Sequence, residues 1–163
     1  MVTWSARRHT KYWAGLAYQF PELSKVLTDD NECVIILQRV GGIMYEVKFY
    51  RDRNGNSELV EYLDELKERG ATSKNERINR DKILTYIGAL EQYGTRIGQP
   101  VVKHIDGSLW ELRPLANRIF FFYWKDNKFV LLHHFIKKTP KTPPREIEQA
   151  RSKLKDFLER HGD

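Results

Sequence analysis

The sequence has a single cysteine, Cys33, and lacks any long hydrophobic run. One cysteine cannot form an internal disulfide, and it excludes a zinc site built on cysteines. The longest unbroken apolar stretch, residues 119–124, has six residues, whereas a membrane-spanning helix needs about 20. The N-terminus also lacks the continuous apolar stretch of a secretory signal. We therefore expect a cytoplasmic protein that has no membrane partner.

Several motifs of metal and cofactor sites are missing as well. Gly94, Gly98 and Gly107 form no GxGxxG or Walker pattern, and no Gly-x-Ser-x-Gly elbow occurs. His133 and His134 are adjacent, and neighbours in a strand point to opposite faces, so they cannot readily chelate one ion. No HExxH motif or Cys/His cluster is present. The sequence predicts neither a metal site nor a cofactor.

The positive charge is concentrated in one part of the chain. The 163 residues carry a net charge of +6, and 40% of them are hydrophobic, enough for one compact domain with a real core. Residues 96–145 alone hold ten Lys/Arg against three Asp/Glu, together with eight aromatic residues. Basic side chains interleaved with aromatics suit single-stranded RNA. An aromatic core flanked by solvated lysines would have the same composition, and composition does not separate the two.

Residue spacing predicts a strand followed by a helical hairpin. Residues 44–50 alternate like a strand, and a helix with apolar residues at i, i+3, i+4 and i+7 follows Ser57. It should stop at Gly70, which suits the left-handed position just beyond a helix end. The capping box Ser73-x-x-Glu76 begins a second helix that runs to Gly94. A short loop joins the two helices, so they are expected to form an antiparallel pair.

The second half of the chain is predicted to be a sheet and a final helix. Four short strands, at residues 101–105, 109–113, 118–124 and 129–137, should form an antiparallel meander because their connections are short. The last helix is expected to be capped by Thr142 with Pro143 at its first position. The predicted fold class is α+β, with the helical hairpin and the C-terminal helix packed on a small antiparallel sheet.

Residues 1–43 stand apart from this pattern, which is complete from residue 44 onward. They can form an accessory subdomain, or they can lie outside the working protein because the start is misassigned. Residues 40–44 (Val-Gly-Gly-Ile-Met) can be encoded by a purine-rich ribosome-binding sequence before a start codon, although other codons fit equally well. We expect an N-terminal extension over residues 1–43 and the functional domain over residues 44–163.

The cations of the predicted strands permit RNA cleavage without a metal, in which the 2′-hydroxyl attacks the adjacent phosphorus. Arginine and lysine can stabilise the charge that develops on the phosphate, and histidine can transfer protons near neutral pH. The candidates are Lys103, Arg113, Arg118, Lys137 and Lys138, with His133 and His134 nearby.

Each candidate also has a purely structural explanation. The arginines can pair with Glu111 or Asp126, either histidine can be a core residue, and the lysines can be a solvated strand end. Strand alternation groups His134 with Leu132 and Lys138, and His133 with Leu131 and Lys137. It leaves open which histidine joins the arginines.

Four segments together resemble the RelE/HigB toxin superfamily, most closely its phage-derived HigB-like branch. They are Leu-Trp-Glu-Leu-Arg at 109–113, Asn-Arg-Ile-Phe-Phe-Phe-Tyr-Trp at 117–124, Val-Leu-Leu-His-His-Phe-Ile-Lys-Lys at 130–138 and Thr-Pro-Pro-Arg-Glu-Ile-Glu-Gln-Ala at 142–150. The resemblance implies a microbial-RNase-like fold and the toxin of a type II toxin–antitoxin pair. Such toxins are metal-independent endoribonucleases that cleave mRNA, typically in the ribosomal A site. The implied partners are a helix-turn-helix antitoxin, mRNA and the ribosome, with operator DNA contacted only through the antitoxin.

The resemblance also implies roles for individual residues. Arg113 and Arg118 match the phosphate-stabilising cations, Lys138 matches a basic residue just after the last strand with Lys137 beside it, and His133 matches the histidine of this branch. His134 stands where many relatives have a small residue, and no tyrosine near the C-terminus matches the proton-transfer tyrosine of some relatives. The expected catalytic residues are Arg113, Arg118, His133, His134, Lys137 and Lys138, and the expected RNA contacts are Lys103, Trp110, Tyr123 and Lys141. The alternative is a catalytically inactive RelE-like module that binds RNA or a partner and acts with an antitoxin in transcriptional autoregulation.

Overall fold

The computed structural model describes residues 25–26, 36–37 and 44–162. The chain divides into two units, Met1–Gly42 and Ile43–Asp163. In the first unit, the short strands β1 (Lys25–Val26) and β2 (Ile36–Leu37) pair antiparallel. The rest of the predicted extension lies outside the described residues, so the fold presented below is that of the second unit.

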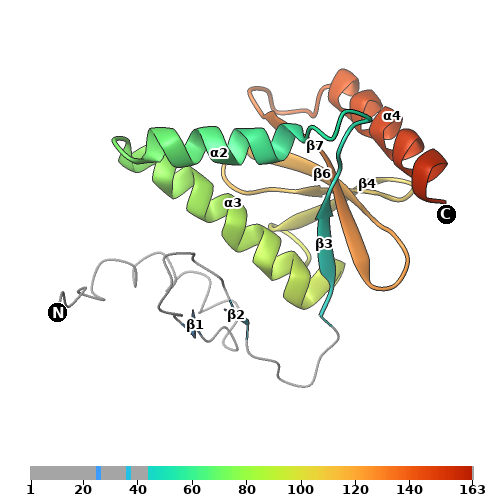
Figure 1. The fold of residues 1–163 in the computed structure, drawn as a ribbon, viewed down its shortest axis with the longest axis horizontal. Helices are drawn as coiled ribbons and strands as arrows, with labels where there is room; N and C mark the ends of the chain where they lie inside the picture. The colour runs from blue at the N-terminus through green and yellow to red at the C-terminus, as the bar shows by residue number, and fades with distance from the viewer. Residues whose placement is uncertain (1–24, 27–35, 38–43, 163) are drawn as a thin grey trace. The chain divides into compact units, whose positions relative to one another are not determined.

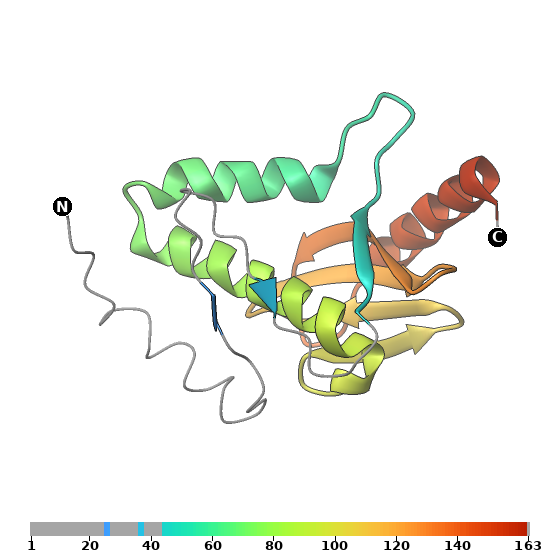
Figure 2. The same cartoon turned by 60° about the horizontal axis from the view of Figure 1, so that its bottom comes forward.

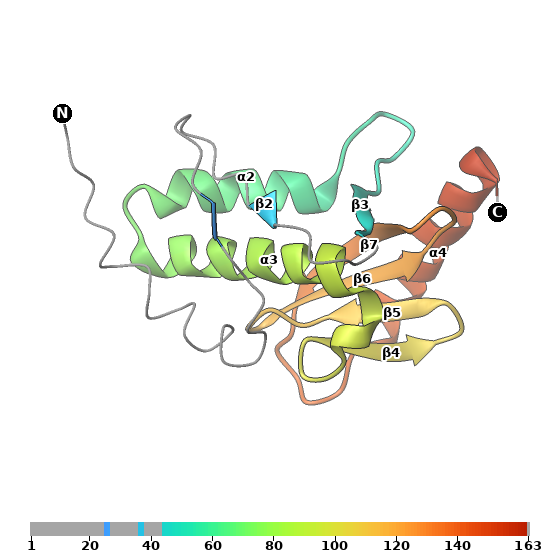
Figure 3. The same ribbon diagram turned by 90° about the horizontal axis from the view of Figure 1, so that it is seen from below.

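The second unit contains a five-stranded sheet with the spatial order β3-β7-β6-β5-β4 (Figure 3). Its strands are β3 (Glu46–Phe49), β4 (Val102–Asp106), β5 (Leu109–Leu112), β6 (Asn117–Tyr123) and β7 (Lys128–Ile136). The last four form the predicted antiparallel meander, whereas β3 pairs with β7 in parallel. The sheet is therefore mixed rather than wholly antiparallel. A parallel neighbour needs a long connection, and the helical hairpin together with three strands supplies it.

The hairpin turns follow local sequence rules. Gly107, in the predicted Asp-Gly turn between β4 and β5, has a φ of 54°. Asp126 and Asn127 between β6 and β7 have φ values of 55° and 57°, and the amide of Lys128 donates to the carbonyl of Lys125. Two consecutive left-handed residues are typical of a tight hairpin turn that matches the twist of the strands.

Helices α2 (Glu58–Gly70) and α3 (Lys74–Tyr93) lie side by side as the predicted hairpin (Figure 2). Ser73 Oγ accepts a hydrogen bond from the amide of Glu76 at 3.4 Å, as the capping motif predicts. Gly94, with a φ of 58°, ends α3 and begins the short 3-10 helix η1 (Gly94–Ile97).

Gly70 has a different role from the one predicted. It is the last residue of α2 rather than a left-handed residue beyond the helix end. A side chain at Gly70 would meet the backbone of Arg77 in α3 at 3.4 Å. This is ordinary van der Waals contact, and the absence of a side chain here keeps α2 and α3 next to each other at the turn of the hairpin.

The C-terminal helix α4 (Pro144–His161) begins one residue later than predicted, with Pro143 at its N-cap. Thr142 makes no cap; its Oγ1 donates instead to a carboxylate oxygen of Glu111 at 3.2 Å. Because the Thr142 hydroxyl is bound to Glu111, it does not cap the helix. The local capping rule therefore predicts a start of α4 that is one residue too early.

The helices cover the two faces of the sheet, the hairpin on one side and α4 on the other (Figure 1). Sheet residues such as Ile119, Phe121 and Leu131 pack against the hairpin, whereas Phe120 and Leu132 pack with Phe157 of α4. This architecture confirms the predicted α+β fold class. No helix among the described residues is both long and apolar enough to cross a membrane.

A bulge in β7 alters which side chains share a face. Phe121 pairs with Leu131 but Phe120 pairs with His133, so Leu132 is the extra residue. An extra residue reverses the alternation beyond it, and Leu132 and His133 both face α4 while His134 faces the hairpin. The predicted grouping of His133 with Leu131 and of His134 with Leu132 was therefore wrong.

Candidate functional site

Four side chains form a row across the α4 face of the sheet. Lys103 of β4 is opposite Glu111 of β5, Glu111 is opposite Phe120 of β6, and Phe120 is opposite His133 of β7. Strands are about 4.8 Å apart, so Glu111 and His133 are separated by roughly 10 Å. The bulge in β7 brings His133, rather than His134, into this row.

The two predicted arginines converge on Glu111. Its Oε1 lies 3.4 Å from Nε of Arg113 and 3.5 Å from Nε of Arg118. Glu111 is only 1% exposed, and Thr142 donates to its other carboxylate oxygen. A carboxylate this deeply buried requires charged or hydrogen-bonding partners; here the arginines and Thr142 supply them. The group carries two positive charges against one negative charge.

Arg118 is held much more tightly than Arg113. Its Nη1 donates to the carbonyls of Leu115 at 2.9 Å and of Asn117 at 2.6 Å, and the residue is 9% exposed. Burial and the nearby charge of Arg113 lower the pKa of Arg118, and Glu111 opposes this, but a guanidinium remains protonated at any physiological pH. The side chain of Arg113 is 25% exposed, so of the two it is the more accessible to a ligand.

His133 is buried between two carboxylates and an ammonium group. Its Nε2 lies 2.7 Å from Glu146 at the start of α4, and its Nδ1 lies 3.2 Å from Glu58 of α2 and 3.3 Å from Lys153 of α4. A doubly protonated ring can donate to both carboxylates, and a neutral ring can donate to Glu146 while accepting from Lys153. The imidazole of His133 therefore lies within hydrogen-bonding distance of two carboxylates and one ammonium group.

Glu58 and Lys153 form an ion pair beside His133. Burial alone would raise the pKa of Glu58, but hydrogen bonds from His133 and Lys153 lower it to about 2. Glu58 is therefore a carboxylate at neutral pH and holds the positive charge of Lys153 next to the imidazole.

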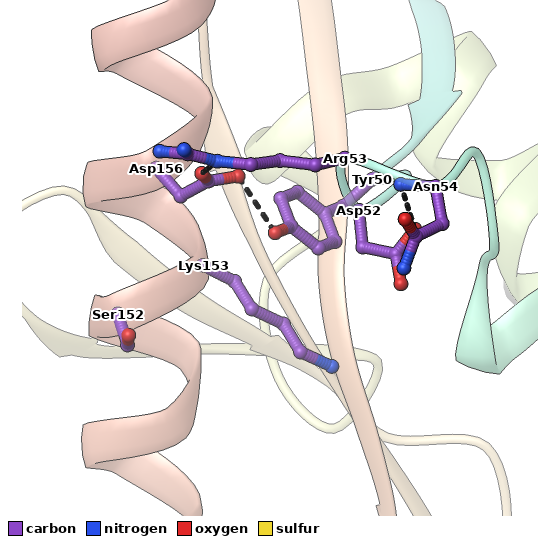
Figure 4. Close-up of a pocket in the computed structure, with 7 residues that line it drawn as sticks. All are labelled: Tyr50, Asp52, Arg53, Asn54, Ser152, Lys153 and Asp156. Atoms are coloured by element: carbon purple, nitrogen blue, oxygen red, sulfur yellow. Dashed lines mark hydrogen bonds and ion pairs between the residues drawn. The ribbon is translucent and has the colours of Figure 1, made fainter.

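An open hollow beside α4 lies next to this cluster (Figure 4). Lys153 belongs to both, because it lines the hollow and also reaches His133. The hollow is also lined by Tyr50, whose hydroxyl donates to Asp156 at 2.8 Å, and by Arg53, which pairs with the same carboxylate. These lining groups compensate one another's charge.

His134 lies on the opposite face of the sheet. Its ring stacks on Tyr62 of α2 with the centroids 4.2 Å apart, and its Nε2 lies 3.0 Å from Oδ1 of Asn117. Burial lowers the pKa of His134 to about 4. The structure does not bring this histidine to the arginines, and at neutral pH it is uncharged.

The remaining residues of the predicted site are four lysines and two aromatic residues, and they differ in exposure and in the sheet face on which they lie. Lys103, Lys138 and Lys141 are exposed and Lys137 is half-buried, and within residues 44–162 none of the four has a recorded ion pair. Trp110 and Tyr123 pack toward the hairpin face through Phe121 and Phe129. They do not share the face that presents the arginines.

Sequence reasoning missed the acidic members of this site. Glu111 was considered only as a surface partner of the arginines, and Glu58, Glu146 and Lys153 were not considered. One signal was available: Glu111 and Arg113 are two residues apart along a strand, which places both on one face. No group of His, Cys, Asp and Glu side chains in the described part of the chain is arranged to hold a metal ion.

Comparison with known protein families places much of the chain in one of them. The profile of the phage-derived Gp49-like protein family matches residues 61–155. This stretch runs from α2 into α4 and includes both arginines and His133. The family is associated with toxins of toxin–antitoxin pairs related to HigB and RelE. A search of curated proteins found no match.

Proposed function

Because the chain belongs to the Gp49-like family of phage-derived proteins, a family of toxin–antitoxin toxins, we propose that it is a metal-independent endoribonuclease toxin that cleaves mRNA on the ribosome. The observation that carries this proposal is the convergence of Arg113 and Arg118 on Glu111, in the same sheet face as His133. Two guanidinium groups beside a carboxylate and an imidazole are the groups that phosphodiester cleavage by the 2′-hydroxyl needs.

The proposed reaction assigns a role to each group. The 2′-oxygen attacks the adjacent phosphorus, and the carboxylate of Glu111 accepts the proton that leaves the 2′-hydroxyl. Arg113 and Arg118, with Lys137 and Lys138 nearby, stabilise the charge that accumulates on the phosphate oxygens. The bond from phosphorus to the 5′-oxygen breaks as His133 donates a proton to that oxygen. The products are a 2′,3′-cyclic phosphate and a 5′-hydroxyl.

Access to these groups requires a local movement. Glu111 and His133 are 1% and 5% exposed, and Thr142 and Glu146 lie directly against them. The proposal therefore includes a displacement of residues 137–146 when RNA binds, so that the 2′-hydroxyl replaces Thr142 as the donor to Glu111 and an RNA oxygen replaces Glu146 as the acceptor from His133.

The functional test is controlled expression of the full chain in a bacterial host. We expect growth arrest, together with cleavage of transcripts inside translated regions as mapped by primer extension. Normal growth and intact transcripts from a folded, expressed protein would contradict the proposal.

The burial of Arg118 also supports a second candidate function. Arg118 is occupied by two backbone carbonyls and by Glu111, which is also what a structural ion cluster looks like. In this alternative the chain is an inactive RelE-like module that binds RNA or an antitoxin and takes part in transcriptional autoregulation. It predicts RNA or antitoxin binding without any cut transcripts, so the expression experiment separates the two.

The exposed lysines are proposed to hold the RNA backbone. Replacing both Lys103 and Lys141 with alanine should weaken binding of a non-cleavable RNA about tenfold at low salt, because each phosphate contact releases counterions. The rate at saturating RNA should not change. The measurement is fluorescence anisotropy at several salt concentrations, and the salt slope should fall by about one unit per lost contact.

The control for these lysines is a double replacement of Lys67 and Lys155, two exposed lysines on α2 and α4. It removes the same charge from other surfaces and should leave the affinity nearly unchanged. Equal losses in both double variants would mean that only overall charge matters, and the proposed contacts would be wrong.

The domain boundary is also a proposal. A chain that begins at Met44 should fold and keep the activity of the full chain, because the members of both core clusters that the structure describes all lie from residue 45 onward. Circular dichroism, thermal unfolding and the expression assay measure this. An unfolded or inactive protein would assign residues 1–43 a structural or functional role.

A further inference from the structure

Sequence analysis did not single out Asn117. In the structure, every donor and acceptor position of its side-chain amide makes a hydrogen bond. Its Oδ1 accepts from His134 Nε2 at 3.0 Å and from the hydroxyl of Tyr62 at 3.3 Å. Its Nδ2 donates to Oδ1 of Asn79 at 2.7 Å and to the carbonyl of Pro114 at 3.2 Å. The residue is 2% exposed. An amide offers two donors and two acceptor positions, so all four are used.

These four bonds join parts of the chain that are distant in sequence. Tyr62 belongs to α2, Asn79 to α3 and His134 to β7, whereas Pro114 opens the turn between β5 and β6. Asn117 thus fixes the turn at residues 114–117 to three separate elements.

The turn is held in a conformation that its own sequence does not favour. Leu115 has a φ of 54° although it is 54% exposed. A left-handed conformation is unfavourable for a branched residue such as leucine, and it persists only where surrounding contacts impose it. Two hydrogen bonds to the carbonyl of Pro114 supply such contacts. One comes from the side-chain Nδ2 of Asn117, and the other comes from its backbone N–H at 2.9 Å.

Two carbonyl groups of this turn accept hydrogen bonds from the guanidinium of Arg118. Its Nη1 donates to the carbonyls of Leu115 and Asn117, which leaves its buried Nε 3.5 Å from Oε1 of Glu111, an ion-pair contact without a hydrogen bond. No hydrogen bond is recorded between the Asn117 side chain and the guanidinium, so any influence passes through the backbone of the turn.

We propose that Asn117 is a positioning residue for Arg118: its amide locks the 114–117 turn, and the turn's carbonyls aim the guanidinium at the phosphate site beside Glu111. The part that concerns the rate of cleavage rests on the proposed function. A purely structural role, in which Asn117 only attaches the helical hairpin to the sheet, predicts lower stability without any specific effect on Arg118.

A kinetic cycle separates these two roles. Asn117→Ala should lower kcat about 10- to 100-fold with KM unchanged, because small displacements of a catalytic group have effects of this size. In an Arg118→Ala background the same substitution should cause no further loss, since it acts through Arg118. Ile83→Val, which removes a methylene from the hairpin core, serves as a destabilised control with unchanged kcat.

Several outcomes would overturn the inference. Equal loss of rate in both backgrounds, or no loss from Asn117→Ala, would assign Asn117 a structural role only. An Arg118→Ala variant with full activity would instead contradict the proposed function. If Asn117→Ala does not fold, Tyr62→Phe, which removes one of the four bonds, should give a smaller effect of the same kind.

An NMR experiment without RNA tests whether Asn117 positions Arg118. In the ¹⁵N-labelled full chain, the Nε–H signal of Arg118, assigned by its absence in Arg118→Ala, should exchange slowly with solvent. In Asn117→Ala that signal should shift toward those of exposed arginines and exchange at least tenfold faster, while Ile83→Val leaves it unchanged. An Arg118 signal that Asn117→Ala leaves in place would refute the positioning role even if the protein cleaves RNA.

Discussion

Replacing Arg113 with alanine should lower the rate of mRNA cleavage at least about a hundredfold, the usual effect of removing one group that stabilises developing negative charge. Arg113 is the better test of the two arginines because its side chain is 25% exposed and, within the described residues, its guanidinium donates to no backbone carbonyl, unlike that of Arg118. Glu111 keeps Arg118 and Thr142 as partners, so stability should fall by only roughly 2 kcal/mol. The measurement is primer extension on a translated reporter mRNA, with thermal unfolding as a check of the fold.

The matched control is Arg69→Ala, which removes the same charged group from the helical hairpin. Arg69 is half exposed and pairs with Glu65 and Glu76, far along the chain from the sheet arginines. Its loss should change cleavage less than twofold. Undiminished cleavage by a folded Arg113→Ala variant would remove the main support for the assigned phosphate site.

Lowering the pH from 6.5 to 4 should cost the protein roughly 3 kcal/mol of stability through His134 alone. Burial lowers the pKa of His134 from 6.5 to about 4 in the folded protein. Between these values the unfolded chain binds a proton that the folded protein does not, so stability falls as the pH falls. Above pH 6.5 this residue makes no contribution to the pH dependence.

Comparison with His134→Gln isolates this effect from other titrating groups. The Nε2 of glutamine can still donate to Oδ1 of Asn117, but it does not titrate. Urea unfolding at several pH values between 7 and 4 should therefore give a smaller decrease in unfolding free energy for the variant. Glu58 also contributes to stability through its lowered pKa, and this contribution is lost only as the pH falls toward 2. Because Glu58 is present in both proteins, it does not affect the comparison. Parallel pH curves for the two proteins would show that His134 is not the titrating group.

Local patterns predicted the elements well because their signals are local. The apolar spacing of the two hairpin helices, the cap at Ser73 and the glycine at residue 94 all correspond to observed features. The direction of β3 was not predictable in the same way, since alternation within residues 44–50 is the same for a parallel and an antiparallel strand.

The site was predicted less completely, for tertiary reasons. In Val-Leu-Leu-His-His at residues 130–134, consecutive apolar residues conceal the bulge at Leu132, so alternation assigned the histidines to the wrong neighbours. Sequence analysis named Glu111 only as a possible partner of the arginines, and acidic residues are seldom buried without partners. Its burial depends on the arginines and on Thr142, which only the folded chain brings together.

The most direct measurement of the central proposal is the chemistry of the RNA ends. Transcripts cut during expression should carry 2′,3′-cyclic phosphates and 5′-hydroxyls, and a single 2′-deoxy substitution at the scissile nucleotide of an mRNA translated in vitro should abolish cutting at that position. Fragments ending in 3′-hydroxyl and 5′-phosphate, or cleavage that tolerates the 2′-deoxy nucleotide, would contradict attack by the 2′-hydroxyl and the roles given to Glu111, His133 and the two arginines.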